Sequence, residues 1–318
     1  MKVKKVIILG GSGFIGKSLV NFFSKLKNYN VTATFNKNKP IIINKKVKWL
    51  KADLRIYDDC LKVLKNKDIV IQCAATTSGS KTILKKPYEH VTDNAIINSQ
   101  ILRASYERKI KHFIFTSCTV MYGHSKKGLN ENNVNEKKIF KPYYGVANTK
   151  LYIEKMCKFY SDISNIKFSI IRHSNIYGPY DKFDLNMGHF MATAIMKAQN
   201  KNNKTILING HGNEKRDFLY IDDLINFIKL LIHKQKSNFE IINCTYGRSY
   251  SINEILKKII RFSKNKKTVE KNLLNKSLNV DILVNSLKAK KILKWKPRVR
   301  LHEGIKKTIN WYRNNSSI

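Results

Sequence analysis

The sequence predicts an α/β protein: a Rossmann-type, doubly wound parallel sheet with a smaller C-terminal α/β substrate lobe. Three observations predict this fold. A short apolar run at 6–9 is followed by three closely spaced glycines and then by a helical pattern. Short apolar runs recur at 31–35, 47–50, 68–73, 112–115, 168–172 and 241–243. With 318 residues, 42% of them hydrophobic, the chain is long enough to bury a large core.

The stretch 6–16, VIILGGSGFIG, begins the predicted sheet. Its four apolar residues are too few for a buried helix and suit a buried parallel strand, whereas the pattern over 14–26 is helical. A strand, a glycine turn and a helix in this order place backbone N–H groups at a helix N-terminus, where they bind a pyrophosphate. A glycine turn in any doubly wound fold would explain the strand and the helix, but not three glycines at this spacing. The residues that we expect to bind a dinucleotide here are Gly10, Gly13, Phe14, Ile15 and Gly16.

The end of the second predicted strand favours NADP(H) over NAD(H). An acidic residue at this position would bind the ribose 2′-OH of NAD, but the chain offers Asn36 and Lys37. A neutral and basic edge accepts a 2′-phosphate. NADP is therefore the expected cofactor, and NAD is the alternative.

Three later segments flank the predicted crevice. Asp53 and Leu54 follow the third strand, and Asp53 by itself is also explained as the N-cap of the next helix. The fourth strand ends at Ala74 and Ala75, whose small side chains let the backbone approach a cofactor. Ligands bind outside the carboxyl ends of strands in open α/β sheets, so we expect Ser78, in the loop after this strand, to border the substrate.

These segments resemble those of the extended short-chain dehydrogenase/reductases, the NAD-dependent epimerase/dehydratase family, which acts on nucleotide-diphospho sugars. The resemblance also rests on NIYGP at 175–179, RDFLYIDDL at 216–224 and LKWKP at 293–297, so it covers nearly the whole chain. It implies a dinucleotide-binding domain of residues 1–174 and 218–244. Residues 175–217 and 245–318 would then form the substrate-binding lobe.

The resemblance also implies roles for single residues. Asp53 and Leu54 would contact adenine, and Asn175 would bind the sugar nucleotide. Arg216 would pair with the diphosphate, because a guanidinium matches phosphate oxygens in a two-pronged geometry. Asn94, on a helix predicted over 91–109, would support the site, with a solvent-exposed asparagine as the alternative.

The family signature YxxxK departs here from its usual spacing. Lys150 matches, but position 146 is valine, and the nearest tyrosine, Tyr144, lies six residues before the lysine. In the family the lysine lowers the pKa of the tyrosine so that the phenol exchanges a proton. Six residues of regular helix would put the two side chains on different faces. We therefore predict that the helix begins at or after Val146, or contains a bulge at Gly145, with Tyr144 reaching in from the preceding turn; Tyr143 is the next candidate.

Two further catalytic candidates follow from the resemblance. The strand-end segment TSCTVMYG at 116–123 supplies the group that polarises the sugar oxygen in this family, and alignment places either Ser117 or Cys118 there. The spacing over 181–189 resembles that of the GDP-L-fucose synthases, whose histidine acts with a cysteine on a keto sugar. His189 is therefore a candidate for catalysis and substrate binding, and a structural or exposed histidine is the alternative.

These expectations together predict an NAD(P)-dependent nucleotide-sugar epimerase/reductase with Tyr144 as general acid/base. A UDP-sugar 4-epimerase is the alternative within the class. A dehydratase is disfavoured, because residues 118–120 include no acid. A nonenzymatic dinucleotide-binding protein is the alternative from another class, kept open by the altered tyrosine–lysine spacing.

Composition sets the remaining expectations. The net charge of +39 comes from lysines spread over the whole chain, whereas a nucleic-acid surface concentrates arginines and aromatic residues, so we expect no specific nucleic-acid partner. Five scattered cysteines without a CxxC pair indicate reduced thiols and no metal site. Neither a signal peptide nor a membrane-length apolar run is evident. We therefore expect a cytoplasmic protein without membrane association, and a homodimer.

Overall fold

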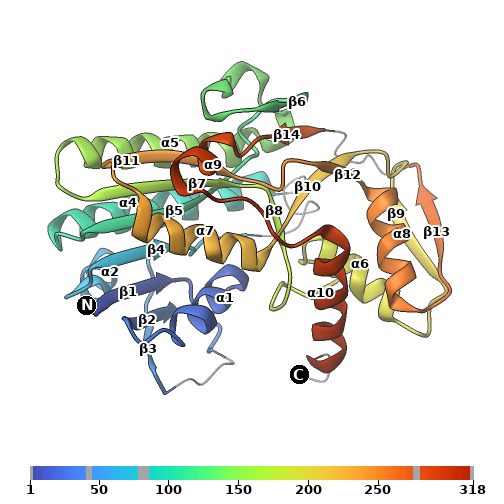
Figure 1. The fold of residues 1–318 in the computed structure, drawn as a ribbon, viewed down its shortest axis with the longest axis horizontal. Coiled ribbons are helices and arrows are strands. Elements are labelled where there is room, and N and C mark those ends of the chain that lie inside the picture. The colour runs from blue at the N-terminus through green and yellow to red at the C-terminus, as the bar shows by residue number, and fades with distance from the viewer. Residues whose placement is uncertain (1–2, 41–44, 78–85, 275–279, 316–318) are drawn as a thin grey trace.

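A seven-stranded parallel sheet forms the centre of the computed structural model, which describes residues 3–40, 45–77, 86–274 and 280–315 (Figure 1). The strand order is β11-β7-β5-β4-β1-β2-β3, and each neighbouring pair is parallel. Its strands are β1 (Lys4–Leu9), β2 (Tyr29–Phe35), β3 (Val47–Lys51), β4 (Ile69–Gln72), β5 (His112–Cys118), β7 (Lys167–His173) and β11 (Phe239–Cys244). The predicted Rossmann-type sheet is confirmed, and the strands lie where the apolar runs predict them.

Helices cover both faces of this sheet. Val6 and Ile8 of β1 pack on one face, and Ile7 and Leu9 pack on the other, because successive side chains of a strand point to opposite sides. The first face is covered by α1 (Phe14–Phe23), α7 (Ile221–Lys234) and α9 (Leu287–Leu293). The second is covered by α2 (Tyr57–Leu64), α4 (Thr92–Glu107) and α5 (Tyr144–Asp162). A strand buried on both faces is apolar throughout, which is why β1 reads as a continuous apolar run.

The strand order reverses between β1 and β4, since β2 and β3 lie on one side of β1 and β4, β5, β7 and β11 on the other. Ligands of open α/β sheets bind in the crevice at such a switch point, outside the carboxyl ends of the strands. The carboxyl ends of β1, β4, β5 and β7 therefore locate the candidate site.

Smaller sheets, three further α-helices and four short helices complete the described part of the chain. Figure 1 shows five elements together at the right of the view, beyond the ends of the large sheet's strands: α6 (Phe190–Gln199), α8 (Ile252–Ser263), α10 (Leu301–Asn315), β9 (Thr205–Asn209) and β13 (Thr268–Asn272). The other strands are β8 (Asn175–Tyr177), β10 (Lys215–Tyr220) and β12 (Ser249–Ser251), which form one sheet, and β6 (Ser125–Leu129) and β14 (Ile282–Val284), which pair. The short helices are η1 (Pro87–His90), η2 (Glu131–Asn133), η3 (Glu136–Lys138) and η4 (Lys141–Tyr143).

The predicted domain boundaries stay a prediction, with one structural qualification. Helix α9 falls within the segment assigned to the substrate lobe, yet it packs against α7 and β11 of the large sheet. The same region is held by Asp223, whose carboxylate accepts the backbone N–H groups of Arg298 and Val299 at 2.9 and 3.1 Å. Asp223 thus ties the C-terminal segment to the first turn of α7.

Candidate active site

The glycine turn after β1 is packed too tightly for side chains. Gly10 has a positive φ of 75°, and a Cβ there would lie 2.7 Å from the Cα of Ala74. A Cβ on Gly16 would lie 2.1 Å from the carbonyl oxygen of Gly10. Gly13 is the N-cap of α1, and no side chain caps the N–H groups of the first turn, which includes Phe14 and Ile15. This end of α1 therefore fits a pyrophosphate.

The ends of β2 and β3 lie side by side where we expect the adenosine of the dinucleotide. The cradle is the predicted dinucleotide site formed by these strand ends, the glycine turn and the first turn of α1. Asn36 and Lys37 are exposed, and the side chain of Asn36 hydrogen-bonds Asp53. Arg55 donates to the Asp53 carboxylate from Nε and Nη2 at 3.0 and 2.6 Å, which lowers the pKa of Asp53 to about 2. Leu54 is buried beside it. The N-cap of α2 is Ile56, so the capping alternative for Asp53 is wrong, and the carboxylate stays ionised at the rim of the cradle.

Asn94 fixes the chain where it leaves β4. It is buried, accepts from the backbone N–H of Thr76 at 2.9 Å and donates to the carbonyl of Thr76 at 3.1 Å. The exposed-residue alternative for Asn94 is therefore wrong. Ala74 and Ala75 come directly before Thr76, after the carboxyl end of β4, and Ala75 is exposed. Ser78 lies outside the described residues.

The two candidates at the end of β5 lie in different environments. Ser117 is fully buried, and its hydroxyl donates to the Glu154 carboxylate at 2.6 Å. The same carboxylate pairs with Arg172 at 2.6 Å, so Ser117 belongs to a buried network. Cys118 is only half-buried and interacts with the charge of Lys150. The structure thus brings Cys118 to the site and turns Ser117 away from it, and burial raises the pKa of the Cys118 thiol, so that it stays protonated.

Lys150, the lysine of the signature, lies on α5 and reaches the end of β5. Its Nζ donates to the carbonyl of Thr116 at 2.9 Å and lies 4.6 Å from the ring centroid of Phe115. Burial lowers the pKa of Lys150, while Cys118, Glu154 and Cys73 oppose this shift. Lys150 is therefore held at the carboxyl ends of β4 and β5.

The predicted placement of Tyr144 is wrong. Helix α5 begins at Tyr144, not at or after Val146, because η4 runs directly into it. The intervening six residues turn Tyr144 about 240° away from the face of Lys150. The Tyr144 side chain is 61% exposed. Gly145 provides no bulge; a Cβ there would lie 2.9 Å from the Cγ2 of Val91, so its role is to let α5 pack closely at this point.

Tyr143 enters the site in place of its neighbour. It is half-buried, hydrogen-bonds Arg216 through its side chain and interacts with Cys118. Its ring packs edge-on against Phe140 with centroids 5.6 Å apart. Burial raises the pKa of Tyr143 and Arg216 opposes this shift. The sequence signal that identifies it is the seven-residue interval to Lys150, which corresponds to about two helical turns.

A histidine–carboxylate pair lies on the substrate side. His189 precedes α6, and its Nδ1 lies 2.9 Å from Oδ1 of Asp181, which raises the pKa of His189. The side chain of Asp181 is 1% exposed, and its Oδ2 has no hydrogen-bond partner in the described part of the chain. His173 of β7, in register with Cys118, interacts with both His189 and Lys150. These interactions connect His189 to Lys150 and, through it, to Cys118. The sequence alone assigns no role to Asp181 or His173, and it makes Tyr143 only the candidate after Tyr144.

The two residues predicted to bind the sugar nucleotide, Asn175 and Arg216, lie on adjacent strands. Asn175 of β8 donates from Nδ2 to the carbonyl of Asp217 at 2.9 Å. Arg216 precedes Asp217 on β10 and donates to the carbonyl of Val280. The Asp217 carboxylate accepts three backbone N–H groups of residues 246–248, which fixes the loop beside both ligands.

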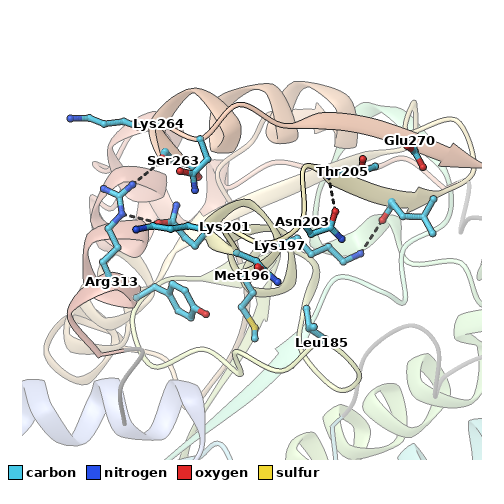
Figure 2. A pocket seen from close by; sticks show the side chains of 15 residues that line it. Leu185, Met196, Lys197, Lys201, Asn203, Thr205, Ser263, Lys264, Glu270 and Arg313 are labelled. Carbon is cyan, nitrogen blue, oxygen red and sulfur yellow. Dashed lines mark hydrogen bonds between the residues drawn. The ribbon is translucent and has the colours of Figure 1, made fainter.

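A separate hollow of about 1150 Å³ opens between α6, β9, α8 and α10 (Figure 2). Two basic side chains that line the hollow hydrogen-bond nearby backbone carbonyls. Arg313 donates to the carbonyl of Ser263 at 2.7 Å, and Lys197 donates to the carbonyl of Leu207 at 2.9 Å. Cations at helix C-termini neutralise the negative end of the helix dipole. No predicted site residue lines this hollow. The catalytic candidates therefore lie elsewhere, at the strand ends.

Among the residues described, none of the helices is both long and apolar enough to cross a bilayer, and no cluster of three metal-ligating side chains occurs. A glycine turn at a helix N-terminus, with a lysine, a thiol and a histidine–carboxylate pair near the neighbouring strand ends, is an arrangement typical of enzymes that use a nucleotide cofactor. Residues 6–245 match the NAD dependent epimerase/dehydratase family, and the chain belongs to this family.

Relatives in this family match the chain over nearly its full length. UDP-glucuronate 4-epimerase of Thermodesulfobacterium geofontis is 25% identical, with 97% of this chain and 96% of the relative covered. GDP-mannose 3,5-epimerase of Arabidopsis thaliana is 26% identical, with 96% and 81% covered. The UDP-glucuronic acid 4-epimerase of Bacillus cereus, solved with UDP-glucuronic acid and NAD, superposes with a TM-score of 0.84 at 24% identity, covering 98% and 99%. The family expectation is confirmed; these relatives do not show the finer resemblance to GDP-L-fucose synthases.

Proposed function

We propose that this chain is an NAD(P)-dependent epimerase/reductase of a nucleotide-diphospho sugar. The observation that carries the proposal is a connected set of side chains. Lys150 interacts with Cys118 and with His173, at the ends of β5 and β7. His173 in turn interacts with His189, which pairs with Asp181. Asn175 and Arg216 extend this set toward the sugar nucleotide.

The cradle residues fit a dinucleotide. When bound, its nicotinamide supplies the acceptor or donor of a hydride. The first turn of α1 after Gly13 would hold the pyrophosphate, and Asp53 and Leu54 would border the adenine. Lys37, with no carboxylate at the end of β2, favours the 2′-phosphate of NADP. Lys150 would position the ribose beside the carboxyl end of β5.

His189 and Cys118 together suit proton transfer at a sugar carbon. Asp181 orients the His189 imidazole through Nδ1, which leaves Nε2 to remove a proton beside a keto group. The half-buried Cys118 thiol, whose pKa is raised, stays protonated and can deliver a proton to the same centre. Removal by one group and return by the other inverts the carbon. The 3,5-epimerase relative supports a reaction of this kind.

A UDP-sugar 4-epimerase is the second candidate, supported by the UDP-sugar 4-epimerases among the relatives. Exchange with solvent deuterium distinguishes the two. Purified protein is incubated in D₂O with UDP-, GDP-, CDP- and dTDP-sugars and their 4-keto forms, and the products are analysed by NMR. Our proposal expects deuterium at the inverted carbon, and its loss in His189→Asn and Cys118→Ala. Inversion at C4 without deuterium would establish the second candidate instead, and no turnover of any sugar nucleotide would reject both.

A homodimer is the proposed assembly, supported by exposed apolar residues on α4, on α5 and at the C-cap of α5. These residues are 39–50% exposed: Ile96, Tyr106, Tyr152, Phe159 and Ile163. Exposed apolar clusters of this kind mark interaction surfaces. Light scattering should report a dimer, and Phe159→Glu should yield a monomer; a monomeric wild-type protein would refute this assignment.

A further inference from the structure

Two adjacent tyrosines at the start of α5 have opposite environments. Tyr144 is 61% exposed and its backbone carbonyl accepts from Asn148, one turn along the helix. Tyr143, the last residue of η4, is half-buried and directed toward Arg216 and Cys118. Only Tyr143 thus reaches the groups that the proposed function places around the sugar.

The distance along the helix separates Tyr143 from Lys150. Seven helical residues turn by about 700°, so both residues lie on one face, but they advance by about 10 Å, against about 6 Å for a four-residue interval. Lys150 in turn donates to the carbonyl of Thr116. The cation that acts on the Tyr143 phenol is Arg216 of β10, and the other titratable group acting on it is Cys118 of β5.

We propose that Tyr143, paired with Arg216 instead of Lys150, donates the proton to the keto oxygen of the sugar during reduction. This inference rests on the proposed function and names the residue that protonates the keto oxygen of the sugar. The carbonyl carbon gains a hydride, with the reduced nicotinamide as the co-reactant, while the carbonyl oxygen takes the phenolic proton. The C=O double bond becomes a C–O single bond, and the resulting tyrosinate, stabilised by Arg216, regains a proton from water.

The burial of Tyr143 agrees with this direction of transfer. A phenol whose pKa is raised by burial stays protonated at neutral pH and acts as an acid. Arg216 stabilises the anion left behind, because its guanidinium stays charged at every pH of interest. This arrangement provides an acid for reduction without a neighbouring lysine.

The adjacent tyrosines give a matched pair of variants for the test. Tyr143→Phe should lower kcat for reduction of a 4-keto sugar nucleotide by about 100-fold or more, the usual contribution of general acid catalysis. Tyr144→Phe should stay within about twofold of wild type. Full turnover by Tyr143→Phe, or an equal loss in Tyr144→Phe, would overturn the proposal.

A titration separates this inference from the proposed function, since it needs no turnover. The ultraviolet difference absorbance of tyrosinate is followed with rising pH, and the curve of Tyr143→Phe is subtracted from that of wild type to give the Tyr143 ionisation. Arg216→Met should move this ionisation to higher pH, and Arg216→Lys should restore it in part. When turnover is measured at saturating substrate, the pH at which kcat falls on the alkaline side should also be higher in Arg216→Met than in wild type. If the pKa of Tyr143 is the same in wild type and in Arg216→Met, the pairing is refuted, even if the enzyme turns over a sugar nucleotide.

Discussion

Replacing Glu154 by glutamine should destabilise the protein far more than its conservative character suggests. The carboxylate is 3% exposed and pairs with Arg172, which is 4% exposed, at 2.6 Å. It also accepts from Ser117 at 2.6 Å. Removing one charge of a buried pair leaves the other uncompensated, at a cost of about 3–5 kcal/mol. Arg172 keeps its bonds to the Tyr122 hydroxyl and the Glu131 carbonyl, so we expect the lower end, about 3 kcal/mol.

The control is a surface ion pair between η3 and α5, the helix that carries Glu154. Glu136 pairs with Lys155 of α5 at 3.0 Å, but both side chains are more than half exposed. Glu136→Gln should therefore change the free energy of unfolding by less than about 1 kcal/mol. Urea unfolding at neutral pH measures both variants. Replacing both partners, as Glu154→Gln with Arg172→Met, should recover most of the loss, because no unpaired charge remains. A Glu154→Gln variant within about 1 kcal/mol of wild type would refute this account of the network.

Four further outcomes are expected. NADP(H) should bind more tightly than NAD(H) at physiological salt, and Lys37→Asp should shift the preference toward NAD; equal dissociation constants by fluorescence titration would contradict this. Gly16→Ala should lower both cofactor affinity and thermal stability, because its Cβ would lie 2.1 Å from the Gly10 oxygen, whereas Gly13→Ala, with 3.3 Å available, should retain the fold. Arg216→Ala should weaken sugar-nucleotide binding by about 1.5–3 kcal/mol in calorimetry without changing cofactor affinity. Burial lowers the pKa of His112 to about 3, so the folded protein binds its proton less readily than the unfolded chain, and stability should be lost as pH falls below about 6.5; His112→Gln should flatten this part of the unfolding profile.

Local pattern was enough to predict the strand, turn and helix at the start of the sheet. The strand at Lys4–Leu9, the glycine turn and the helix at Phe14–Phe23 follow from residues within one short stretch, since each is encoded by sequence period and by glycine spacing. The same holds for the strands of the large sheet, whose burial on both faces makes them apolar. Motifs of short range also predict roles for Lys150 and His189, and the structure connects these two residues through His173.

Tertiary structure decided which residue of two adjacent pairs, Ser117 and Cys118, and Tyr143 and Tyr144, faces the candidate site. On a strand, one residue separates the two faces, so Ser117 meets Glu154 while Cys118 meets Lys150. On a helix, one residue is about 100°, and the start of α5 at Tyr144 selects Tyr143 as the residue that contacts Arg216. These outcomes depend on where an element begins and on what packs beside it. Such long-range contacts have no counterpart in the spacing of nearby residues.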